Sequence, residues 1–151
     1  MLIALDTNIL VHAEGTTNTE RHIETIELLK QLDPKSIVLP YQTLLELSYV
    51  LSRKFGIEKS RTSMIVQEWL KTCNIANGIH STLESALTIF NNHQLQIFDA
   101  FILATASDYQ CDLLLSQDMQ HGFKWKNTTI VDPYRVPTHP LLKSAFLSPD
   151  S

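Results

Sequence analysis

Glycine and cysteine are scarce in this chain, which has 151 residues but only 4 glycines and 2 cysteines. Neither G-x-G-x-x-G nor GxxxxGK[ST] occurs in the sequence, so the usual dinucleotide-binding and P-loop functions are excluded. Cys73 and Cys111 lie far apart without a CxxC pattern, which indicates neither a disulfide framework nor a zinc site. We interpret both as buried thiols.

Positive charge is also limited, with 12 Lys and Arg against 16 Asp and Glu and a net charge of −4. This balance argues against a broad basic surface for nucleic acid, but it does not exclude a nuclease whose acids bind metal ions. The basic residues fall mostly in two stretches, which could form two local patches or simply solvated helix faces. These are Arg53, Lys54, Lys59, Arg61 and Lys71 in the first stretch, and Lys124, Lys126, Arg135 and Lys143 in the second.

Long apolar runs are missing. No stretch approaches the roughly 20 residues of a membrane-spanning helix, and the N-terminus lacks the features of a signal peptide. We therefore expect a cytoplasmic protein without a membrane partner.

The length and the 44% hydrophobic fraction fit one globular domain over 1–151, with an irregular proline-rich tail from about 133.

Short apolar segments alternate with segments of helical periodicity. We expect strands at 2–5, 36–40, 75–80, 113–115 and 129–131, and helices at 19–32, 41–54, 58–72, 81–93 and 96–109. The 75–80 strand is weak, and Ser81 to Glu84 has the pattern of a helix capping box. This alternation predicts an α/β fold of three layers, in which helices cover both faces of a parallel sheet of four to five strands.

Four acidic residues lie in apolar surroundings near the expected carboxyl ends of the strands. They are Asp6, Glu46, Asp99 and Asp118. Functional groups of parallel α/β sheets collect at that edge, and neighbouring carboxylates repel one another unless a cation binds them. Singly, each has an ordinary explanation: a helix cap for Asp6, snorkelling or pairing with Arg53 for Glu46, a first-turn acid for Asp99 and a turn for Asp118. Their shared position favours a common site.

The segments around these acids resemble the four motifs of PIN-domain ribonucleases, in the same order over about 2–131. They are Leu5-Asp6-Thr7-Asn8, the isolated Glu46 in a leucine-rich helix, Asp99-Ala100-Phe101-Ile102-Leu103-Ala104 and Ser116-Gln117-Asp118. The resemblance implies a PIN-like three-layer α/β/α fold with an acidic pocket for Mg²⁺ or Mn²⁺. Many small members are VapC-type toxins of bacterial toxin–antitoxin pairs, which cut RNA and are silenced by a small partner protein.

By this resemblance Asp6, Glu46, Asp99 and Asp118 are the metal-binding and catalytic acids, and Asn8 and Ser116 are supporting polar residues. Asp6 and Asp99 are the candidates for direct ligands, while Glu46 and Asp118 would bind the metal directly or through its waters. RNA cleavage would leave a 5′-phosphate and a 3′-hydroxyl. His121 stands where many of these toxins have a further Asp.

Other functions fit the sequence less well. A catalytically silent PIN-like module that binds RNA or protein is the main alternative, although no acid is missing. An aspartyl phosphotransferase would need a second Asp where Asn8 stands, and the scattered His and Ser residues fit neither a zinc nor a serine hydrolase.

Excess apolar residues in 41–72 predict a homodimer through this region, with packing on the chain's own sheet as the alternative. These residues are Leu45, Tyr49, Ile65, Val66, Trp69 and Leu70.

Overall fold

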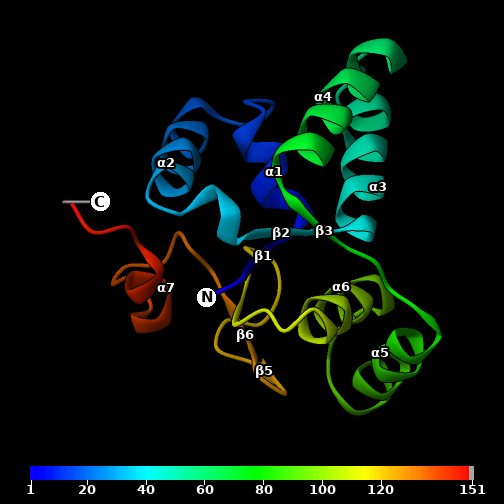
Figure 1. Cartoon of the computed structure of the whole chain (residues 1–151). Coiled ribbons are helices and arrows are strands. Elements are labelled where there is room, and N and C mark those ends of the chain that lie inside the picture. Colours follow the sequence, from blue (N-terminus) through cyan, green and yellow to red (C-terminus); the bar gives the residue numbers. More distant parts are fainter. Residues whose placement is uncertain (150–151) are drawn as a thin grey trace.

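The sheet lies at the centre of the computed structural model, which describes residues 1–149 (Figure 1). Its six strands follow the order β3-β2-β1-β4-β6-β5. The strands are β1 (Ile3–Leu5), β2 (Ile37–Pro40), β3 (Asn74–Ala76), β4 (Leu113–Leu115), β5 (Lys124–Trp125) and β6 (Thr128–Val131). Every pairing is parallel except that of β5 with β6. The two-residue β5 accounts for the one strand beyond the expected four to five, because it is too short to show a periodic pattern.

Helices cover both faces of this sheet, as predicted. One face carries α1 (Thr7–Ala13), α2 (Thr19–Lys30), α3 (Tyr41–Tyr49) and α4 (Lys59–Thr72), and the other carries α5 (His80–Asn92) and α6 (Ile97–Asp108) (Figure 1). A 3₁₀ turn (Pro34–Ser36) precedes β2, and a π-helical turn (Val50–Lys54) extends α3. None of the helices formed by residues 1–149 is long and apolar enough to cross a membrane.

The strands separate two hydrophobic cores because successive side chains point to opposite faces. In β1, Ile3 and Leu5 join the core beneath α1 to α4, whereas Ala4 joins the core beneath α5 and α6. The side chains of both cores are buried, and β1 pairs on each side with another buried strand. This explains why β1 is a continuous apolar segment rather than an alternating one.

Helix α1 was not expected, because its seven residues, which begin at Thr7 directly after β1 and Asp6, are too few to show clear periodicity. Three local expectations were wrong. The proline-rich tail contains α7 (Pro140–Ala145), whose Leu142 is fully buried in the core. Helix α5 begins before Ser81, and Thr82 Oγ1 accepts a hydrogen bond from Ile79 N–H instead. Cys111 is buried as expected, but Cys73 is only partly buried.

Candidate active site

A cavity of about 450 Å³ lies at the carboxyl edge of the sheet. All four predicted acids line it, each from a different element: Asp6 after β1, Glu46 on α3, Asp99 on α6 and Asp118 after β4. Its other lining residues are Thr7, Asn8, Tyr49, Val50 and Gln96. The structure therefore brings together residues that are more than 110 positions apart in the sequence. We call this hollow the acid cavity.

Asp6 is the most enclosed of the four acids, with 4% of its surface exposed. It caps helix α1, since its Oδ1 accepts a hydrogen bond of 2.8 Å from Thr7 N–H. Its Oδ2 accepts a bond of 2.8 Å from Ser116 Oγ. Burial nevertheless raises the pKa of Asp6 to about 7, against the effect of both hydrogen bonds and with help from the negative charges of Asp99 and Glu46. Capping and a role in the site are thus compatible at this residue.

Glu46 and Asp99 face the same cavity from two different helices. Glu46 Oε2 accepts a hydrogen bond of 2.6 Å from Thr7 Oγ1, so the expected alternative of pairing with Arg53 is wrong. Asp99 lies in the first turn of α6 and is half-buried. Burial raises its pKa, and the nearby charges of Glu46 and Asp118 raise it further. The carboxylates therefore act on one another electrostatically.

The loop that follows β4 is held to α1 by several polar contacts. Asn8 Nδ2 donates a hydrogen bond to Asp118 Oδ2. Ser116 Oγ, fully buried, donates to Asp6 and accepts a bond of 3.1 Å from Met119 N–H. Ser116 does not line the acid cavity; it fixes Asp6 and the turn that carries Asp118. Both predicted supporting residues thus contact the acids that they were expected to support.

His12 is a buried residue of the site that the sequence analysis missed. One ring nitrogen, Nε2, lies 2.8 Å from Gln117 Oε1, and the other, Nδ1, lies 2.7 Å from Thr17 Oγ1. His12 therefore ties α1 to the residue immediately before Asp118. A lone histidine within a seven-residue helix carried no sequence signal for this contact. His121, by contrast, lies outside the acid cavity and accepts a hydrogen bond from Asp132 N–H.

The donor set of the acid cavity fits a hydrated divalent cation. None of the ion pairs within residues 1–149 involves any of the four acids, so their charge is not offset by Lys or Arg. Within this part of the chain no group of three or more His, Cys, Asp or Glu residues is arranged so that it could hold a metal ion. Mg²⁺ usually keeps several waters and binds through one or two carboxylates, which suits separated oxygen ligands around an open cavity.

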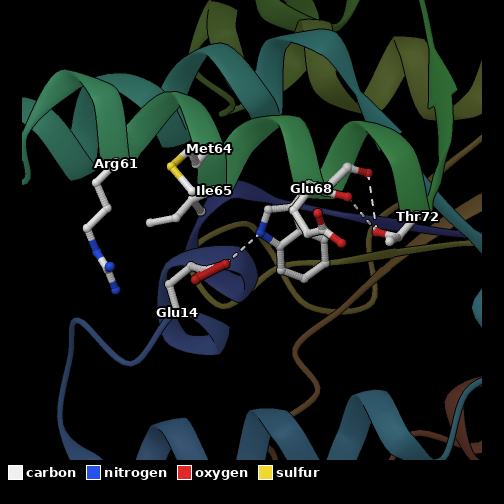
Figure 2. A pocket seen from close by; sticks show the side chains of 7 residues that line it. Glu14, Arg61, Met64, Ile65, Glu68 and Thr72 are labelled. Carbon is white, nitrogen blue, oxygen red and sulfur yellow. Dashed lines mark hydrogen bonds between the residues drawn. The ribbon is translucent and has the colours of Figure 1, made fainter.

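A second hollow, of about 460 Å³, lies between α1 and α4 (Figure 2). Met64, Ile65 and Trp69 supply apolar side chains from α4, and Trp69 Nε1 donates a hydrogen bond of 2.8 Å to Glu14 Oε1. Arg61, Glu68 and Thr72 complete its lining. This mixture of an apolar surface and charged edges differs from the acid cavity, and it shares no lining residue with it.

Comparison with known proteins identifies the family of this chain. The model of the PIN domain matches residues 3–123, so the chain belongs to the PIN domain family. No curated protein matches the sequence. Among solved structures, VapC20 from Mycobacterium tuberculosis, described as a sarcin-ricin loop cleaving toxin, is 16% identical with a TM-score of 0.65, over 77% of this chain and 91% of that one.

Two further structures share the fold. A toxin–antitoxin complex from Klebsiella pneumoniae is 24% identical with a TM-score of 0.66, over 89% of this chain and 99% of that one. VapBC2 from Rickettsia felis, bound to a DNA fragment from its promoter, is 17% identical with a TM-score of 0.61, over 86% and 97%. The predicted PIN-like α/β fold is thereby confirmed.

Proposed function

We propose that this protein is a divalent-metal-dependent endoribonuclease and the toxin of a toxin–antitoxin pair. The observation that carries the proposal is the acid cavity, in which four elements present carboxylates that no Lys or Arg of residues 1–149 neutralises. Burial raises the pKa of Asp6 and of Asp99, and the charges of the neighbouring carboxylates raise both further. Membership of the PIN domain family supports the same conclusion, as does the likeness to VapC20, a sarcin-ricin loop cleaving toxin.

In this proposal Asp6 and Asp99 hold Mg²⁺ or Mn²⁺ directly, and Glu46 and Asp118 hold it directly or through water. The bound cation would supply charge neutralisation and Lewis-acid activation for phosphodiester hydrolysis. The chain's own residues do the positioning. Ser116 and Thr7 N–H fix the two oxygens of Asp6, and Asn8 holds Asp118. Hydrolysis would leave a 5′-phosphate and a 3′-hydroxyl.

The proposal includes a small antitoxin protein as a partner. One of the similar structures, that from Klebsiella pneumoniae, is a toxin–antitoxin complex. On this chain the hollow between α1 and α4 has suitable chemistry for a partner segment, because Met64 and Trp69 offer apolar contact and Glu14, Arg61 and Glu68 offer charge. A small reading frame directly upstream, encoding a DNA-binding module with a disordered tail, would supply such a partner.

A matched pair of substitutions tests the nuclease function. Glu46→Gln removes one charge from the acid cavity, whereas Glu58→Gln makes the same change at an exposed residue outside it. End-labelled mixed-sequence RNA is incubated with each protein in Mg²⁺, Mn²⁺ or EDTA. We expect cleavage by wild type and Glu58→Gln only with metal, and a loss of at least tenfold in Glu46→Gln. RNA binding without any cleavage by wild type would favour the silent-module alternative.

A further inference from the structure

A hollow of about 680 Å³ lies where the C-terminal segment passes the end of β6. Four of its lining residues are basic: His121, Arg135, His139 and Lys143. The rest are Val136, Pro137, Thr138 and Pro140, so no acid within residues 1–149 lines it. We call this hollow the C-terminal groove. It is a local region of positive charge in a chain whose net charge is −4.

The C-terminal groove lies at the same sheet edge as the acid cavity. Strands β4 and β6 are parallel neighbours, and Asp118 and Asp132 follow their carboxyl ends. His121 Nδ1 accepts a hydrogen bond of 3.0 Å from Asp132 N–H, which places His121 at the end of β6. His121 is only three positions after Asp118, so their Cα atoms are at most about 11 Å apart. One extended strand of nucleic acid can reach both sites.

The two imidazoles of the groove are set to donate hydrogen bonds. His121 Nδ1 accepts from Asp132 N–H, and His139 Nδ1 accepts from Leu141 N–H at 3.1 Å. A ring nitrogen that accepts a bond carries no proton, so each neutral ring has its proton on Nε2. The rings meet edge to face, with centroids 5.5 Å apart. Both residues line the C-terminal groove, so each can offer an N–H donor there.

Arg135 and Lys143 add the permanent charge. Both are exposed, and Lys143 forms no ion pair with an acid of residues 1–149. Arg135 has one acidic neighbour, since its Nε lies 3.7 Å from Asp132 Oδ2, too far for a good hydrogen bond. Burial and, next, the positive charge of Arg135 lower the pKa of His121, whereas the charge of Asp132 raises it. A lowered pKa favours the neutral ring, whose Nδ1 accepts the bond from Asp132 N–H. Two cations beside two neutral N–H donors match the oxygens of a phosphodiester.

We propose that the C-terminal groove binds a backbone phosphate of single-stranded RNA next to the phosphate held at the acid cavity. This inference rests on the proposed ribonuclease function. Arg135, His139 and Lys143 all lie beyond residues 3–123, the part that matches the PIN domain model. Most of the groove is thus formed by the C-terminal segment. It gives a protein of net negative charge a positively charged site for the phosphates of RNA.

The first test measures RNA binding in EDTA, where metal-dependent cleavage cannot occur. Fluorescence anisotropy of a labelled 12-nucleotide mixed-sequence RNA gives Kd over a series of KCl concentrations. The variant Arg135→Gln with Lys143→Gln should raise Kd about tenfold at 0.1 M salt and lower the slope of log Kd against log salt by about 1.4, because each phosphate contact on a single strand contributes about 0.7. The control, Lys124→Gln with Lys126→Gln, removes the same charge outside the groove and should match wild type.

A second variant tests the neutral donors. His121→Ala should raise Kd severalfold without changing the salt slope, since it removes a hydrogen bond rather than a charge. Thermal melting checks that each variant folds. Any of three results would refute RNA binding by the groove. They are an unchanged salt slope in the Arg135/Lys143 variant, an equal loss of RNA affinity in the Lys124/Lys126 control, and no RNA binding by wild type.

Turnover separates this inference from the proposed function. With Mn²⁺, the Arg135/Lys143 variant should show a raised KM for the RNA and an unchanged rate with bis(p-nitrophenyl) phosphate, which is too small to reach the groove. If wild type cleaves neither substrate but the binding result holds, the proposed function fails and the groove stands as a binding site. If wild type cleaves RNA and the variant binds and cleaves equally well, the groove alone fails.

Discussion

Ser116 Oγ donates a hydrogen bond of 2.8 Å to Asp6 Oδ2, although the two residues lie 110 positions apart. The bond joins the ends of the adjacent strands β1 and β4, whose register pairs Leu5 with Leu115. It also opposes the effect of burial on Asp6, because it stabilises the charged carboxylate. One hydroxyl therefore contributes both to the sheet edge and to the charge state of the acid cavity.

Replacing Ser116 by Ala should weaken the fold and the metal site together. The change removes the bond to Asp6 and leaves Met119 N–H without its acceptor, at a cost of about 1–3 kcal/mol in the free energy of unfolding. Urea denaturation measures this cost. Ser144→Ala is the control, since it removes an exposed bond to Leu141 O and should change stability by less than about 0.5 kcal/mol. Equal effects in the two variants would contradict the prediction.

Asp6→Asn should stabilise the metal-free protein increasingly as pH rises from 4 to 7. The folded carboxyl has a pKa of about 7 against an ordinary value of 3.8, so between these values the folded state binds more protons than the unfolded state. Wild type therefore loses stability as pH rises through this window, and the total is on the order of 4 kcal/mol. Asn has no such dependence. Urea curves for both proteins in EDTA at pH 4, 5.5 and 7 measure the difference.

Asp6→Asn and Asp99→Asn should each lower the rate of RNA cleavage by orders of magnitude while the protein stays folded. Each variant keeps the size of the side chain and loses one negative charge from the acid cavity. RNA cleavage assays in Mg²⁺ or Mn²⁺ beside wild type measure the loss. Cleavage at the wild-type rate by both variants would refute their assignment as metal ligands.

Mn²⁺ should raise the melting temperature of wild type and have a much smaller effect on Asp6→Asn. A ligand that binds only the folded state stabilises it by about 2.7 kcal/mol at 100 times its Kd. Below pH 7 the effect should shrink, because the metal must then displace a proton from Asp6. Thermal melts in millimolar Mn²⁺ and in EDTA, each at pH 6 and pH 8, provide the comparison. A wild-type melting temperature that is the same in Mn²⁺ as in EDTA would count against the metal site.

The predicted homodimer through 41–72 now rests on fewer residues. Ile65, Val66 and Trp69 pack against the chain's own core, whereas Leu45 and Tyr49 are 65% and 66% exposed and Leu70 is also exposed. We expect sedimentation at tens of micromolar to show a dimer that Leu45→Arg weakens. Ile23→Arg, a matched change at an exposed residue of α2, should leave the dimer intact. A wild-type monomer at this concentration would exclude the association.

The sequence predicted the acids of the site because their positions depend on strand ends. Asp6 directly follows β1 and Asp118 lies three positions after β4, and the carboxyl ends of parallel strands share one edge. Glu46 and Asp99 were visible as charges within apolar helices. These features are local in the sequence, and the fold only had to bring them together, which it does in the acid cavity.

Contacts that depend on tertiary packing could not be predicted. The bond between His12 and Gln117 links residues with no shared sequence pattern, and α7 is a six-residue helix held by the burial of Leu142 rather than by periodicity. The π-helical turn after α3 was read as ordinary helix, because the hydrogen bond from Phe55 N–H to Val50 O leaves the apolar pattern unchanged.

The central place of β1 in the sheet has a consequence for synthesis on the ribosome. Strand β1 emerges first, yet one of its two neighbours is β4, and Ser116 and Asp118 follow β4. A nascent chain that ends before Leu113 can carry Asp6, Glu46 and Asp99, but it has neither the strand that closes one side of β1 nor the hydroxyl that fixes Asp6. The acid cavity is therefore completed only late in translation, and a chain that terminates before β4 lacks both Asp118, which lines the cavity, and Ser116, which fixes Asp6.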